Sequence, residues 1–261
     1  MIKILHRFFF AWIFLTKLPA PPLPKAQKED WGRIAPYFVL IGFILGFILY
    51  FFANFFSKYH LSVMFSALLI LLIWNLMTGC LHLDGLMDTF DGINCQDKDR
   101  KIEAMKDSRI GAFGAIAGIF VILFKLIALC TILINKLFFI IIFSLPLARL
   151  IAVYALSFLS INNKAGISSS MFTAGIKKPQ DFMINLLTFV VVFFTVSPAL
   201  QLSSSPVHIL MFLIVSCLLS ALWAHWLDNH FKGHTGDTYG ALIELSETTI
   251  LCLGVILKNY L

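Results

Sequence analysis

The feature that most constrains this chain is a series of apolar runs, each close to 20 residues long. At about 1.5 Å per helical residue, such a run crosses a hydrocarbon layer of about 30 Å. The runs are apolar on all sides and lack the alternation of a barrel strand, which favours transmembrane helices. We expect about seven spans, near residues 34–53, 61–80, 110–134, 137–160, 182–200, 207–227 and 239–261.

Composition agrees with a membrane protein. Hydrophobic residues make up 59% of the chain and charged residues 13%, whereas a soluble domain carries about 25% charged residues. The sequence shows no long-period repeat and no span-free stretch long enough for a separate domain. It therefore predicts an all-α fold, a polytopic transmembrane helical bundle that forms one integral membrane domain over residues 1–261.

Residues 1–33 precede the first span and hold a short apolar stretch, from Phe8 to Leu15, behind Lys3 and Arg7. A signal peptide has a similar layout, but the TKLPAPPLP that follows is not a small-residue cleavage site. We expect instead an interfacial or re-entrant helix, joined to the first span by a stiff proline-rich link.

The 20 Lys and Arg residues exceed the 14 Asp and Glu residues, giving a net charge of +6. With the N-terminus in the cytoplasm, residues 1–33, 81–109, 161–181 and 228–238 lie inside and carry 15 of the 20 cations. This asymmetry predicts a multi-pass protein whose N-terminus and acidic segments lie on the cytoplasmic side, and it removes the need for a nucleic-acid partner. The five cysteines are widely spaced and indicate neither a disulfide framework nor a zinc site.

Half of the acidic residues fall within 84–107, and HLDGLMDTFDG at 82–92 continues the second span in helical rhythm. On such a helix Asp84, Asp88 and Asp91 share one stripe, where their charges repel one another. Oxygen ligands at this density suit Mg²⁺ better than zinc or a transition metal. The plainer alternative is a helix cap or an acidic surface turn.

Mg²⁺ held by carboxylates at a membrane surface indicates cleavage of a diphosphate, which also needs cationic ligands for phosphate. The cytoplasmic loop offers Arg100 and Arg109, while Lys125 and Arg149 lie within spans. Cations inside a membrane mark either function or an ion pair. For Lys125 and Arg149 the structural alternative is a pair with Glu244 or Glu247, and both readings stay open.

The segment KDSRIGAFGAIAG at 106–118 opens the third span, with Asp107 and Ser108 as possible helix caps. Gly111, Gly114 and Gly118 have the spacing of a close helix contact. The free N–H groups of this helix N-terminus would also be able to receive a phosphate.

A second acidic cluster lies in residues 228–247, where GHTGDTYGALIELSE begins at Gly233. A helix starting near Thr235 places Asp237 in its first turn and Glu244 on the same side. Capping accounts for Asp237, but it does not account for Glu244 and Glu247 within an apolar run.

Taken in order, HLDGLMDTFDG, MKDSRIGAFGA and HTGDTYGALIELSE closely resemble the motifs of the cobalamin synthase family, adenosylcobinamide-GDP ribazoletransferase. FLTKLPAPP at 14–22 is similar to that family's N-terminal motif. The resemblance implies an inner-membrane, Mg²⁺-dependent transferase. It implies transfer of the adenosylcobinamide phosphoryl group from adenosylcobinamide-GDP to α-ribazole or its 5′-phosphate, with release of GMP.

Carried over by position, the resemblance assigns metal binding to the acidic residues Asp84, Asp88, Asp91 and Asp237, with Glu244 completing or facing the site. It implies that the aligned motif residues Asp107, Ser108, Thr235 and Gly236 help to bind the substrate or cofactor. Arg109 and Arg149 would stabilise the transferring phosphoryl group, together with Arg100 and Lys125, and His82 would be a candidate base. The expected partners are these small molecules and membrane lipid, with a homo-oligomer possible.

Two other functions are compatible with the residues. Asp88, Asp91 and Gly92 resemble the core motif of CDP-alcohol phosphotransferases, although the Ala-Arg that continues that motif is absent. An ion-coupled transporter would place its carboxylates near the membrane midplane, whereas these cluster at one face.

Overall fold

The computed structural model describes residues 2–24, 28–95, 101–105, 107, 109–162, 176–198, 200 and 205–261. Its regular elements in these ranges are helices, joined by one isolated β-bridge between Ile161 and His234. Arg100 and Ser108, both expected to serve the site, lie outside the described residues. The all-α prediction is confirmed over the part that is described.

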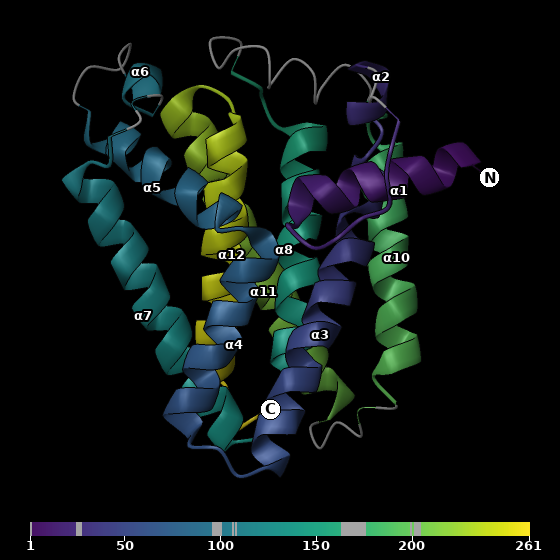
Figure 1. The fold of residues 1–261 in the computed structure, drawn as a ribbon, viewed down its shortest axis with the longest axis vertical. Coiled ribbons are helices and arrows are strands. Elements are labelled where there is room, and N and C mark those ends of the chain that lie inside the picture. Colours follow the sequence, from purple (N-terminus) through teal and green to yellow (C-terminus); the bar gives the residue numbers. More distant parts are fainter. Residues whose placement is uncertain are drawn as a thin grey trace.

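Each of the seven expected apolar runs forms a helix. They are α3 (Phe38–Lys58), α4 (Val63–Thr78), α7 (Ala112–Ile134), α8 (Phe139–Phe158), α10 (Gln180–Val196), α11 (Pro206–Phe231) and α12 (Gly236–Ile256), packed side by side as a bundle (Figure 1). Among the helices described, five are long and apolar enough to cross a membrane alone, whereas α10 is shorter and α4 reaches span length only with the helix after it. The multi-pass architecture is confirmed, and the count of seven is approximate.

Helix α8 occupies the centre of the bundle, and nearly all of its residues are buried. Two glycines of α3 allow the backbones of α3 and α8 to touch. A Cβ at Gly42 would lie 2.6 Å from Pro146 Cα, and one at Gly46 would lie 2.6 Å from Ile142 O. Small residues at such a contact are typical of packing between membrane helices.

The N-terminal helix α1 (Ile2–Leu15) lies across one end of the bundle rather than along it (Figure 1). Phe10 and Leu15 are buried against the bundle, while Ile4 and Leu5 are exposed. This placement agrees with the expected interfacial helix. The short helices α2 (Lys28–Trp31) and η1 (Ala35–Tyr37) lead from α1 into α3.

The acidic motif forms helix α5 (Leu81–Asn94), but this helix does not continue the second span as the sequence predicted. The chain turns by 86° between α4 and α5. Gly79 and Cys80 make the turn, with left-handed φ values of 61° and 58°. Because α5 runs at a steep angle to α4, we treat it as lying outside the membrane-spanning segments. We treat the next helix, α6 (Lys101–Met105), in the same way.

Helix α5 is wedged between α7 and α12, and glycines allow the close approach on both sides. A Cβ at Gly85 would lie 2.8 Å from the backbone oxygen of Asp237, and one at Gly114 would lie 2.5 Å from Met87 O. Gly240 of α12 also packs against the backbone of α5, at His82 and Gly85. The wedge therefore brings the two acidic motifs into direct contact.

Candidate active site

Three carboxylates come together where α5 crosses the first turn of α12. Asp84 and Asp88 lie on α5, and Asp237 lies at the N-terminal end of α12. Burial raises the pKa of Asp88, and the charges of Asp84, Asp237 and Asp91 add to this effect in that order, which brings the pKa to about 6. The acidic group, as we call Asp84, Asp88 and Asp237, is thus a concentration of negative charge assembled from both sequence motifs.

The donor chemistry of the acidic group fits a hard divalent cation, because carboxylate oxygens are the ligands that Mg²⁺ prefers. No other described residue forms an ion pair with Asp84 or Asp88. With the side chains as they stand, no three His, Cys, Asp or Glu residues in the described ranges converge closely enough to hold an ion. The acidic group is therefore an electrostatic cluster, and its side chains would have to rotate inward to form a coordination shell.

Asp91 has a different environment from the other two acids of its motif. Its carboxylate accepts hydrogen bonds from the backbone N–H groups of Gly111 and Gly114, both 2.8 Å long. These donors are free at the start of α7, so Asp91 caps this helix from a neighbouring one. The helix N-terminus that was expected to receive a phosphate thus receives an internal carboxylate.

The expected caps of α7 do not cap it. The helix begins at Ala112, and its N-cap residue Gly111 offers no side chain. Asp107 instead pairs with Arg109, 2.7 Å from its Nη2, and the hydrogen bonds from Arg109 lower the pKa of Asp107 to about 2. The Arg109 side chain is 88% exposed, so it is held by Asp107 at the surface rather than directed into the acidic group.

Two cations and two glutamates form a buried network between α7, α8 and α12. Lys125 lies 2.5 Å from Glu244 and 2.7 Å from Glu247, and Arg149 pairs with the other oxygen of Glu247. Lys125 also lies over the ring of Trp74, 4.6 Å from its centroid. All four charged side chains are almost completely buried.

This network bears on three of the expected site residues. Lys125 and Arg149 are paired with glutamates, as the ion-pair alternative predicted. Nε and Nη2 of Arg149 have no hydrogen-bond partner among the residues described. Glu244 is held by Lys125 instead of facing the acidic residues of α5. The geometry therefore favours a structural role for all three residues.

His82 lies between the network and the acidic group. It is 3% exposed, and its Nε2 has no hydrogen-bond partner in the described part of the chain. Burial, followed by the charge of Arg149, lowers the pKa of His82 to about 3. The imidazole is therefore neutral at physiological pH, and its low pKa makes it a weak proton acceptor.

A hollow of about 270 Å³ borders the acidic group, and we call it the acidic pocket. Asp84 and Asp237 lie at its edge, and His82, Tyr239 and Gly236 also contribute to its lining. The rest of the lining is apolar: Phe14, Leu15, Phe38, Leu81, Ala152, Leu156, Gly240 and Ile243. Phe14 and Leu15 of helix α1 close one side of the pocket. The space next to Gly236 is open, because a Cβ at this position would meet no atom within 4 Å.

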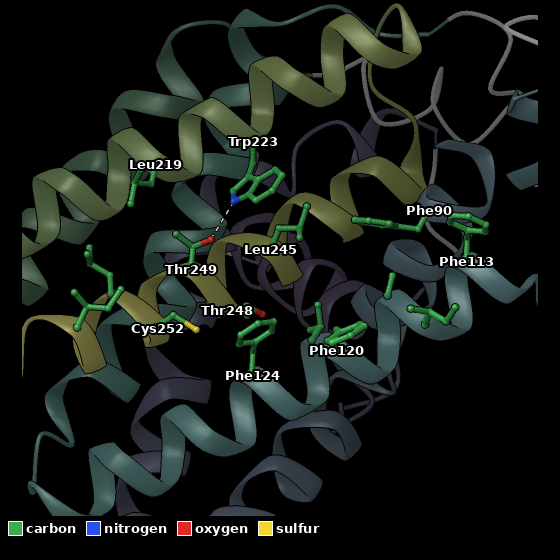
Figure 2. A pocket seen from close by; sticks show the side chains of 15 residues that line it. Phe90, Phe113, Phe120, Phe124, Leu219, Trp223, Leu245, Thr248, Thr249 and Cys252 are labelled. Atoms are coloured by element: carbon green, nitrogen blue, oxygen red, sulfur yellow. Dashed lines mark hydrogen bonds between the residues drawn. The ribbon is translucent and has the colours of Figure 1, made fainter. Parts of the chain in front are cut away.

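A larger hollow of about 560 Å³ lies between α7, α11 and α12 (Figure 2), and we call it the apolar groove. Phenylalanines from α5 and α7 line it, including Phe90 and Phe120. Trp223 Nε1 donates a hydrogen bond to Thr249 Oγ1 across it, 3.0 Å long. No Asp, Glu, Lys or Arg lines this groove.

The turn before α12 is held by internal hydrogen bonds. Thr235 caps the helix by accepting from the Thr238 N–H, and its own N–H donates to the Thr238 hydroxyl. His234 is buried and stacks on Tyr239 at 4.9 Å between ring centroids. Thr235, expected to bind substrate or cofactor, is therefore a helix cap, while its neighbour Gly236 reaches the acidic pocket.

Sequence reasoning missed two contributions to the site. Phe14 and Leu15 wall the acidic pocket, although the motif that contains Phe14 was already visible at 14–22. The capping role of Asp91 was also missed, because only the fold shows that its partners lie some twenty residues away.

Comparison with known proteins shows the family of the chain. The sequence model of the family described as cobalamin-5-phosphate synthase matches residues 7–255, which include all four motifs. The chain belongs to this family. It is accordingly a transferase of cobalamin biosynthesis, and the full-length match favours this class over the CDP-alcohol phosphotransferases and the transporters.

Three curated relatives of the chain are each named adenosylcobinamide-GDP ribazoletransferase. The protein from Synechocystis sp. is 31% identical, with 94% of this chain and 96% of the relative aligned. The protein from Trichormus variabilis is also 31% identical over 98% of this chain and its own full length. The protein from Clostridium botulinum is 33% identical, covering 97% and 98%. No solved structure matches the chain significantly.

The capping role of Asp91 is testable in Mg²⁺-free protein. Replacing Asp91 with Ala leaves two N–H groups of α7 without their acceptor, and we expect the free energy of unfolding to fall by about 1–2 kcal/mol. Asp84→Ala is the control, because it relieves repulsion and uncaps no helix. Equal stability of the two variants in thermal unfolding would contradict the capping role.

The buried network predicts that Arg149→Met destabilises the protein by about 3–5 kcal/mol, because Glu247 loses a buried partner. The double variant Arg149→Met/Glu247→Gln removes both charges and should recover most of the loss, since Lys125 and Glu244 remain paired. Thermal unfolding in detergent measures the stability of the single and the double variant. A single variant with normal stability and lost activity would point to phosphate binding instead.

Proposed function

We propose that this protein transfers the adenosylcobinamide phosphoryl group from adenosylcobinamide-GDP to α-ribazole or its 5′-phosphate, with Mg²⁺ and with release of GMP. The observation that carries the proposal is the meeting of three carboxylates, Asp84, Asp88 and Asp237. Two of them, Asp84 and Asp237, line a pocket. Family membership and the common name of the relatives support the substrates.

The acidic group would hold the metal, with Asp84, Asp88 and Asp237 as ligands. Bound Mg²⁺ would neutralise charge on the diphosphate and on the departing GMP. Asp91 would contribute indirectly. Its hydrogen bonds to Gly111 and Gly114 hold α7 against α5 and so keep Asp88 in place. A proton from the acceptor hydroxyl would pass more readily to a carboxylate of the acidic group than to His82, because burial lowers the pKa of His82 to about 3.

The position of the acidic group supports a site at the cytoplasmic face of the inner membrane. It lies at the end of the bundle where α1, α5 and α6 gather (Figure 1). These helices belong to the Lys- and Arg-rich segments that the positive-inside rule assigns to the cytoplasm. In this orientation a soluble nucleotide reaches Arg109 and the acidic group without crossing the membrane.

A direct assay tests the reaction. Purified protein in detergent, given adenosylcobinamide-GDP, α-ribazole and Mg²⁺, should release GMP, and chelation of Mg²⁺ should stop it. Asp88→Asn should lower kcat at least 100-fold and leave the protein folded. Glu103→Gln is the matched control, because Glu103 is an exposed acid on α6. Absence of GMP with wild-type protein, with either Mg²⁺ or Mn²⁺, would reject the proposal.

The raised pKa of Asp88 makes stability depend on pH. Its ordinary value is 3.8 and its value in the fold is about 6. The protonated form therefore stabilises the metal-free fold fully below about pH 3.8, and this contribution is lost as the pH rises through 6.

We expect the melting temperature of metal-free protein to fall between pH 4.5 and 7, and Mg²⁺ to restore it at pH 7.5 but not at pH 5. In the Asp88→Asn variant, we expect the melting temperature to depend less on pH and to respond less to Mg²⁺. A Mg²⁺ effect of equal size at pH 5 and pH 7.5 would show that Asp88 does not exchange its proton for the metal.

A further inference from the structure

We propose that the acidic pocket binds the aromatic base of the acceptor nucleoside, so that α-ribazole enters it with its flat ring first. This inference rests on the proposed function and adds to it the place where one of the two substrates binds. It is carried by the size of the pocket, by its aromatic and aliphatic lining and by the absence of Lys and Arg from that lining.

The size and lining suit one small aromatic group. The volume of about 270 Å³ is just below the range of about 300–1,000 Å³ that is typical of small-molecule sites. Rings of Phe14, Phe38 and Tyr239 and aliphatic side chains such as Ile243 form most of the wall. A dimethyl-substituted benzimidazole presents apolar edges to such a wall, whereas guanine has polar edges that would stay unpaired there.

Two residues of the lining carry a polar atom that has no partner among the residues described. They are His82, at Nε2, and Tyr239, at its hydroxyl oxygen, and both atoms are buried. As the side chains stand, both atoms are closed off from the pocket, so a ligand would reach them only after a side-chain rotation. A benzimidazole riboside has a ring nitrogen and ribose hydroxyls that would pair with them in that case.

The pocket interior offers nothing that would hold the phosphates of the other substrate. No Lys or Arg lines it, and Asp84 and Asp237 border its edge. The phosphates of a GDP group would therefore stay at a metal ion on these two carboxylates and leave the apolar interior to a neutral base. A nucleoside seated base-first also leaves its ribose near Asp84 and Asp237, where the acceptor hydroxyl is needed.

The apolar groove is a less suitable site for the base. It is about twice as large and is lined by α7, α11 and α12 without any charged residue. Its Trp223 and Thr249 already satisfy each other by a hydrogen bond. The groove therefore provides control positions on the same helix, α12, as part of the acidic pocket.

The experiment compares two phenylalanine substitutions on α12. Ile243→Phe narrows the acidic pocket, and Leu245→Phe, two residues along the helix, narrows the apolar groove. Tyr239→Phe is a milder third variant that removes only the unpaired hydroxyl. We measure KM for α-ribazole and for adenosylcobinamide-GDP, and the equilibrium binding of α-ribazole alone by its benzimidazole fluorescence.

We expect Ile243→Phe to raise KM for α-ribazole and its dissociation constant at least tenfold, and Tyr239→Phe to raise them threefold or more. KM for adenosylcobinamide-GDP should change less than twofold, and Leu245→Phe should behave as wild type. Normal α-ribazole binding by both pocket variants would overturn the inference, and so would a raised KM for adenosylcobinamide-GDP alone.

The binding measurement separates this inference from the proposed function. If wild-type protein releases GMP but the pocket variants bind α-ribazole normally, the inference fails and the reaction stands. If α-ribazole binds and the pocket variants weaken it while no GMP is formed, the pocket assignment stands and the reaction fails.

Discussion

The backbone contact between α5 and α12 is the constraint on which the rest of the site depends. Gly85 and Gly240 have no side chain, so the two helices touch at the level of Asp237. This contact joins two acidic motifs that lie about 150 residues apart in the sequence. Without it, Asp84 and Asp88 would be separate surface acids, and the acidic pocket would have no common wall.

Charge is divided between two layers around this contact. The buried network of Lys125, Arg149, Glu244 and Glu247 contains two positive and two negative groups, so it adds no net charge to the interior. The acidic group at the bundle end holds three carboxylates, and no described cation forms an ion pair with Asp84 or Asp88. Burial and the neighbouring carboxylates together raise the pKa of Asp88. The first arrangement holds three helices together, and the second creates the demand for a cation.

The helices and the family could be predicted from the sequence, because apolar length and motif order are local properties. The break at Gly79 and Cys80 could not, since the helical spacing of the acids is the same on a straight helix and on a bent one. The partners of Asp91 were equally inaccessible, whereas a pair of Arg149 with Glu244 or Glu247 was one of two readings that the sequence left open. A carboxylate or guanidinium shows in sequence only that it needs a partner, and the partner is chosen by packing.

The break also explains why an N-terminal motif accompanies the catalytic ones. The Lys17 N–H donates to Met77 O at the end of α4, and the Lys17 side chain packs over Gly79, where a Cβ would clash with it. The same segment places Phe14 and Leu15 on the wall of the acidic pocket. Because one stretch both supports the turn and closes the pocket, a change in the 14–22 motif would disturb the position of α5 and the shape of the pocket together.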